Sequence, residues 1–144
     1  MTKVQVQAYY KKQHAEEPAL ISSPEDVDAL IDSLAFGAEF ESMAVLQSLQ
    51  REDLPSGFPD HEFLVGANGE RQVGIVSFVD DKNYISTSAS KVQGEVVYHV
   101  AENPTEFPAA AEIPLPLVRE AVKEFLLSGG RRPTCIEWQE EPGI

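Results

Sequence analysis

A helix, a glycine pair and a short apolar segment dominate the C-terminal part of the sequence. After Pro116, apolar residues recur at the spacing of one helix face: Leu117, Val118, Ala121, Val122, Phe125 and Leu126. Gly129 and Gly130 predict the end of this helix, because glycine tolerates the left-handed conformation of a C-cap, and Pro133 prevents its continuation. Residues 134–138 then predict a short terminal strand. We expect such a strand to be held by pairing in a sheet.

A second helix is predicted near the N-terminus. Ser23 is a typical N-cap, Pro24 suits the first helical position, and Asp26 lies three residues after the cap. The apolar residues that follow have helical spacing, Val27, Leu30, Ile31 and Leu34, and Gly37 supplies a stop. Before this helix, residues 4–10 alternate between apolar and polar, which predicts a half-buried strand.

The middle of the chain predicts a meander of short strands at residues 43–49, 62–66, 72–79, 84–88 and 95–100. Asn68-Gly69 favours a tight hairpin turn. The composition of residues 11–18, 51–60 and 102–116 predicts loops, the last with four prolines. Strands joined by short turns pair antiparallel, so the predicted fold is α+β: an antiparallel meander of about five to seven strands with two helices packed on it.

The chain has the size of one domain, residues 1–144, and its charge restricts its partners. The formal net charge of −13 disfavours nucleic acid and anionic membranes as partners. The acidity either confers solubility alone or complements a basic partner. We find no stretch of membrane-spanning length and no signal peptide at the N-terminus, and expect a cytoplasmic protein.

Residues with catalytic or metal-binding chemistry are sparse. The three histidines, His14, His61 and His99, lack metal-ligand spacing, and residues 59–62 form the only cluster of potential ligands. Cys135 has acidic neighbours, which raise a thiol pKa and make a poor nucleophile. We therefore expect no catalytic residue, no metal and no cofactor.

The C-terminal segment resembles the closing signature of the "Imm-one" immunity protein family of bacterial polymorphic toxin systems. The residues that carry the resemblance are Ala121, Phe125, Gly130, Arg132, Pro133, Ile136 and Trp138. The hairpin from Val73 to Ile85, followed by small polar residues from Ser86 to Ser90, is similar to the central hairpin of that family. The match extends over residues 20–139. Phe125, Gly130, Arg132, Pro133 and Trp138 form its structural signature.

The resemblance implies a non-enzymatic inhibitor that binds a co-produced toxin, commonly a deaminase, and occludes its active site. A toxin that acts on nucleic acid needs a cationic cleft, which an acidic protein can fill. The expected partner is therefore a cognate toxin with a cationic cleft.

Contacts with such a partner are expected mainly on loops and turns, with one exposed position on the terminal strand. The candidates are Glu52, Asp53, Phe58, Asp60, Asp80, Asp81, Asn83, Tyr84 and Glu137. Phe58 is either a plug over the core, which we favour, or an exposed anchor. Trp138 is expected to pack against the helix, under Phe125, with its N–H bonded to a carbonyl.

Two other classes of function stay open. One is a small α+β ligand-binding or enzymatic domain with a pocket near residues 102–116. The other is a module that recognises peptides at an exposed sheet edge.

Overall fold

The computed structural model describes residues 4–88 and 92–140. Ala89 and Ser90, the end of the polar segment noted above, lie outside the described residues. The elements in chain order are β1 (Val6–Tyr9), η1 (Lys12–Ala15), β2 (Ala19–Ile21), α1 (Pro24–Phe36), β3 (Met43–Ser48), β4 (Glu62–Asn68), β5 (Val73–Val79), β6 (Asn83–Ser86), β7 (Glu95–Val100), β8 (Asn103–Pro108), η2 (Ala109–Ala111), β9 (Ile113–Pro114), α2 (Leu115–Leu127) and β10 (Trp138–Glu140).

The described residues form an eight-stranded antiparallel sheet and a separate two-stranded hairpin. The main sheet has the order β10-β6-β5-β4-β3-β1-β2, and β9 pairs with β5 beside this path. Strands β7 and β8 form the hairpin. The α+β class and the antiparallel sheet are confirmed, with more strands than the pattern predicted.

Two of the additional strands, β8 and β9, lie in a segment whose composition predicted a loop, and β2 directly follows another such segment. β8 contains Pro104 and Pro108, which cannot donate a hydrogen bond to a sheet. They are accommodated because β8 pairs on one side only, with β7. β2 and β9 are three and two residues long, too short for an alternation pattern to show.

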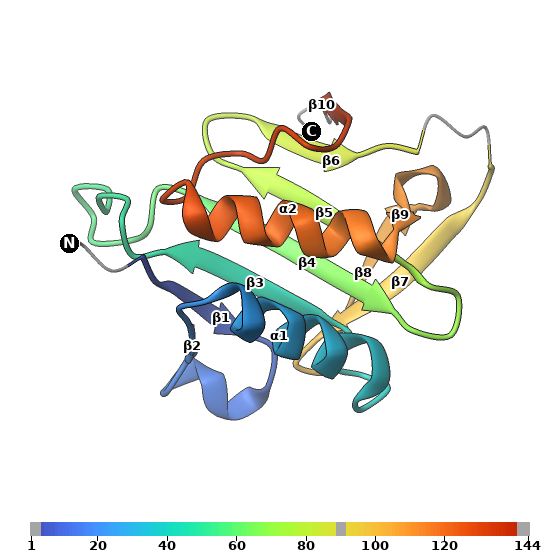
Figure 1. The fold of residues 1–144 in the computed structure, drawn as a ribbon, viewed down its shortest axis with the longest axis horizontal. Helices are drawn as coiled ribbons and strands as arrows, with labels where there is room; N and C mark the ends of the chain where they lie inside the picture. Colours follow the sequence, from blue (N-terminus) through green and yellow to red (C-terminus); the bar gives the residue numbers. More distant parts are fainter. Residues whose placement is uncertain (1–3, 89–91, 141–144) are drawn as a thin grey trace.

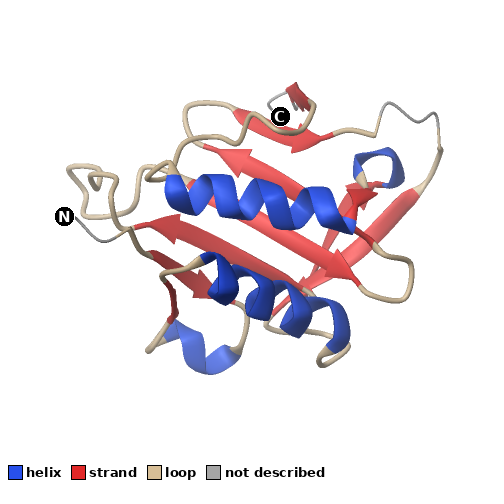
Figure 2. Ribbon diagram, viewed as in Figure 1, coloured by secondary structure: helices blue, strands red, loops and turns tan. Residues whose placement is uncertain are grey.

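Both predicted helices are present and lie on the same face of the sheet (Figures 1 and 2). Ser23 is the N-cap of α1, and its hydroxyl accepts the N–H of Asp26 at 3.1 Å. At the C-terminal end of α2, Gly129 and Gly130 have φ angles of 77° and 98°, as the C-cap prediction required. The N–H of Gly130 donates to the carbonyl of Phe125 at 3.0 Å.

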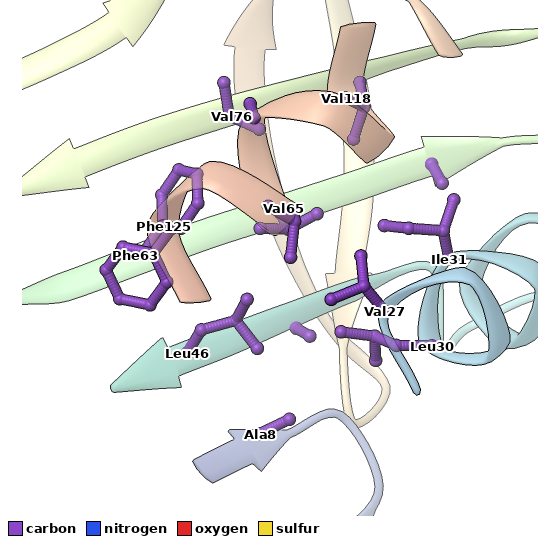
Figure 3. Close-up of a cluster of buried hydrophobic side chains, with 14 of the residues drawn as sticks. Ala8, Val27, Leu30, Ile31, Leu46, Phe63, Val65, Val76, Val118 and Phe125 are labelled. Carbon is purple, nitrogen blue, oxygen red and sulfur yellow. The ribbon is translucent and has the colours of Figure 1, made fainter. Parts of the chain in front are cut away.

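The main core lies between these helices and the sheet (Figure 3). At one end it contains an aromatic cluster, in which the Phe125 ring lies 4.7 Å from Phe63 and 6.2 Å from Phe78. All three side chains are buried. This end of the core supports the loop that follows β3.

A second, smaller core lies on the other face, under the β7–β8 hairpin. Its buried members are Met43, Ile75, Ile85, Tyr98, Phe107 and Ala111. The Tyr98 hydroxyl donates to the Glu112 carboxylate at 2.6 Å, and Arg71 forms two hydrogen bonds to the same carboxylate. Burial and the bond to Glu112 raise the pKa of Tyr98. The network fastens the hairpin to the main sheet.

Two turn and strand predictions were wrong in detail. The β4–β5 connection is residues 69–72, since Asn68 pairs with Val73, and the positive φ, 56°, falls on Gln72. Gly69 instead packs against α1, where its N–H donates to the carbonyl of Ala35 at 3.2 Å. The terminal strand starts only at Trp138, because the Glu124 carboxylate binds the N–H groups of Thr134 and Cys135 and draws the preceding backbone towards α2.

Candidate functional site

Most of the predicted contact residues gather at one end of the main sheet. Pairing of Glu62 with Val79 places the loop before β4 and the turn after β5 side by side. The C-terminus of α2 reaches the same end (Figure 1). We call residues 51–60 the acidic loop and residues 80–83 the acidic turn.

The acidic loop is fixed by a network around Asp60. The Arg51 guanidinium donates to both Asp60 oxygens, at 2.9 and 3.0 Å, and to the carbonyl of Gly130 at 3.0 Å. His61 Nδ1 lies 2.8 Å from Asp60 Oδ1. Burial opposes ionisation of Asp60, but the bonds from Arg51 and His61 outweigh it and lower its pKa. Asp60 therefore stabilises the loop from within.

His61 is buried at 3% exposure and uses both ring nitrogens inside the fold. Its Nε2 accepts the N–H of Ser48 at 2.9 Å, so the ring proton is on Nδ1 and is donated to Asp60. Burial lowers the pKa of His61, which favours this neutral form. Neither nitrogen is open to a metal or a substrate. Within residues 4–88 and 92–140, no group of three His, Cys, Asp or Glu side chains is arranged to hold a metal ion.

Phe58, on the acidic loop, faces solvent. Phe58 is 70% exposed, so the favoured interpretation of a plug over the core was wrong. Glu52 and Asp53 are also exposed. Between this loop, β1 and β3 lies a hollow of about 400 Å³, lined by Gln7, Tyr9, Gln47, Asp53 and Asp60 among others.

The acidic turn adds further exposed polar groups beside the loop. Asp80, Asp81 and Asn83 are exposed, whereas Tyr84 is half-buried. The Arg132 guanidinium lies 3.8 Å from the centroid of the Tyr84 ring, a cation–π contact. Glu137 is exposed but apart from this group, next to Thr87 beyond the other end of β6.

The predicted signature residues hold the C-terminal segment against this end of the sheet. Gly130 approaches β3 so closely that a Cβ there would lie 2.6 Å from the Ser48 Cβ and 2.8 Å from the Arg51 Cδ. The carbonyl of Pro133, a buried residue, accepts the indole N–H of Trp138 at 2.7 Å. Trp138 is half-buried against the main core, which contains Phe125. The expected carbonyl partner of the indole is confirmed.

Cys135, the single cysteine of the chain, is half-buried. Burial and the neighbouring Glu124 and Glu120 raise the pKa of its thiol to about 11, the predicted direction. A thiol with this pKa is protonated at neutral pH and is a weak nucleophile.

The sequence did not reveal Arg51, Ser48 and His61 as the residues that fix the loop. Arg51 donates a hydrogen bond to the carbonyl of Gly130, 79 positions away in the sequence. The N–H of Ser48 donates to His61, 13 positions away. Neither spacing belongs to a recognisable motif. The one available signal was the Asp60-His61 pair directly before an apolar strand.

The Pro-rich segment of the alternative hypothesis also lines a hollow. This hollow, of about 440 Å³, lies between the main sheet and β8, with Leu64, Ser77, Val79, Thr105 and Phe107 in its wall. The Ser77 hydroxyl donates to the backbone carbonyl of Tyr84 at 3.1 Å, so it is not directed at a ligand. No helix in the described part of the chain is long and apolar enough to cross a membrane.

The fold and the candidate site define an acidic α+β protein with exposed acidic residues at one end of an antiparallel sheet. The sequence matches the family model "Immunity protein Imm1" over residues 15–140. The chain therefore belongs to the Imm1 immunity protein family, as its C-terminal signature indicated, and this membership supports an immunity function against a toxin.

Comparisons with curated sequences and with solved structures add no further information on function. No curated protein sequence matches the chain. The crystal structure of a hypothetical protein from Neisseria gonorrhoeae is similar with a TM-score of 0.44 and 8% sequence identity, covering 92% of this chain and 90% of that one.

Proposed function

We propose that this protein is a cytoplasmic, non-enzymatic inhibitor that binds a cognate toxin of a polymorphic toxin system over its active site. The toxin we propose acts on nucleic acid, as a deaminase does, and presents a cationic substrate cleft. Family membership supports the immunity role, and the net charge of −13 supports a cationic partner surface.

The observation that carries the proposal is the exposed, firmly held acidic loop. Phe58 offers an aromatic side chain at 70% exposure, and Glu52 and Asp53 offer carboxylates on the same loop. An exposed aromatic group on a fixed loop is a typical anchor of a protein interface, because little conformational entropy is lost on binding. Asp80, Asp81, Asn83, Tyr84 and Glu137 would add peripheral contacts, and Asp60 would hold the loop.

Acidic residues around such an anchor are expected to act mainly on the rate of association. Opposite charges steer two proteins together, and salt screens this effect. An inhibitor that must capture its toxin quickly gains from such steering.

The test is coexpression with the toxin encoded by the neighbouring gene, with cell growth and copurification as readouts. We expect the wild-type protein to restore growth and to copurify with the toxin. Asp53→Lys combined with Asp81→Lys should slow association at low salt by about tenfold or more. The matched control, Glu17→Lys with Glu120→Lys, reverses two exposed carboxylates elsewhere and should change the rate less. Failure of both growth rescue and copurification with that toxin contradicts the proposal.

A further inference from the structure

The face of the main sheet that lies opposite the helices is only half covered. Residues paired directly across an antiparallel sheet have side chains on the same face. One such row contains Ala8, Leu46, Phe63 and Phe78, which are buried at 1% exposure or less beneath α1 and α2. The rows on either side of it therefore point to the opposite face.

The first of these opposite rows runs through Tyr9, Val45, Leu64, Ser77 and Ile85. Ser77 and Ile85 are buried, but Tyr9, Val45 and Leu64 are only half-buried. The second row contains Gln7, Gln47, Glu62, Val79 and Asn83, and none of these five is buried. We call the two rows together the open face.

The open face lies between two hollows of the molecule. At one side is the hollow under the acidic loop, which Gln7, Tyr9 and Gln47 line. At the other side is the hollow beside β8, which Leu64, Val79 and Asn83 line. Val45 pairs with Tyr9 of the first hollow and with Leu64 of the second, so the walls of the two hollows belong to one continuous surface. The exposed side chains of Leu49 and Leu54 lie on the chain that bounds it, at 45% and 48% exposure.

Charge is distributed unevenly around this face. Its two rows contain no lysine or arginine, and the carboxylates of Asp53, Glu62 and Glu106 are on its rows or in the walls of its hollows. Arg51, which lines one hollow, is bound to Asp60 and Gly130. On the helix side, by contrast, Arg119 and Lys123 bind Asp28. The open face thus has an apolar centre and polar flanks, and its margin is acidic except near Tyr9, where Lys11 and Lys12 line a further hollow and Lys12 is paired with Glu102 at 2.8 Å.

We infer that the open face is the main seat of the toxin, which rests on it with a basic surface surrounding an apolar centre. This inference rests on the proposed function and extends it from the acidic loop to the adjoining sheet. Charge complementarity selects the occupant: a basic protein surface is attracted to the acidic margin, whereas a second copy of this chain, also at −13, is repelled. The apolar centre supplies the area from which water is expelled on binding.

The test compares substitutions on the open face with one on the helix side. Leu64→Lys and Val79→Lys each place a cation in the proposed seat, and Leu127→Lys is the matched control on α2, where the leucine is 59% exposed. Affinity for an inactivated neighbouring toxin is measured by calorimetry, and circular dichroism verifies folding. We expect a loss of affinity of about thirtyfold or more for the first two variants, and little change for the control.

A second measurement does not depend on variants. Hydrogen exchange of the wild-type complex should show new protection in β4, β5 and the acidic loop, and none in α1. If the wild-type protein binds no toxin, the proposed function fails. If it binds, but the folded open-face variants bind equally well or protection falls on α1 and α2 instead, the inference is overturned. A wild-type dimer that these variants disrupt would likewise overturn it, by assigning the face to a second copy.

Discussion

His61 holds the acidic loop in place through both of its ring nitrogens. Its two nitrogens join Ser48 on β3 to Asp60 on the acidic loop, while its ring centroid lies 5.7 Å from that of Phe125. A second proton would place a donor against the Ser48 N–H and abolish that bond. The neutral ring is therefore a requirement of this packing.

This requirement predicts a pH dependence of stability. The pKa of His61 is lowered in the folded protein, so below about pH 6.5 the unfolded chain binds more protons than the folded one. The free energy of unfolding therefore decreases as the pH is lowered through that range. From about pH 7.5 to about pH 5.5, wild type should lose more unfolding free energy than His61→Gln, which cannot titrate. Denaturant unfolding at both pH values measures this, with His99→Gln as control. Equal losses in wild type and His61→Gln would contradict the prediction.

Among the structural elements, α2 is held in place at its C-terminal end by the contacts of Gly130. Gly130 has a positive φ of 98°, carries a carbonyl bound by Arg51, and lies against the Ser48 side chain. A helix end, a strand end and the acidic loop therefore meet at one backbone position where a side chain cannot fit.

Gly130→Ala should destabilise the protein by about 3 kcal/mol, from backbone strain and from the clash with Ser48 and Arg51. Gly57→Ala is a matched control, because Gly57 also has a positive φ, 89°, but no atom lies within 4 Å of the position that a Cβ would take there. Its cost should be about 1 kcal/mol, from strain alone. Chemical denaturation compares the two variants, and similar costs would show that the contact with β3 contributes nothing.

The sequence predicted the elements that depend on interactions within a few residues, such as helix caps and apolar spacing. The Ser23 cap, the glycine pair after α2 and the alternation around β1 all predicted elements that are present. The strand β8 was missed because its prolines are tolerated only when the pairing is one-sided, which depends on the arrangement of the whole sheet. The start of β10 was misplaced because Glu124, on another element, binds the preceding backbone.

For the candidate site too, local features could be predicted from the sequence, whereas the grouping of distant residues could not. Exposure of Glu52, Asp53, Asp80 and Asp81 follows from charged loop composition, and the predicted loop at residues 51–60 is present between β3 and β4. The grouping of the two loops needed the pairing of Glu62 with Val79, and the open face needed the complete register. Such relations between distant residues leave no periodic signal in one sequence.

For the molecule as a whole, the excess of negative charge should oppose folding. With 24 acidic and 11 basic residues, carboxylates repel one another more than ion pairs compensate, and folding brings them closer. Raising sodium chloride from about 20 mM to about 200 mM shortens the Debye length and should raise the thermal midpoint. Differential scanning calorimetry measures the shift. A lower midpoint in salt would mean that surface ion pairs outweigh the repulsion.

The contact between Arg51 and the Gly130 carbonyl also affects when the acidic loop can take its final shape during synthesis of the chain. A chain is made from its N-terminus, so the acidic loop is synthesised long before the residue that helps to anchor it. Until residue 130 has emerged and docked, Arg51 lacks one of its acceptors and the loop lacks its support from α2. A nascent or interrupted chain would therefore present the loop without its final shape, which it would reach only when synthesis is nearly complete.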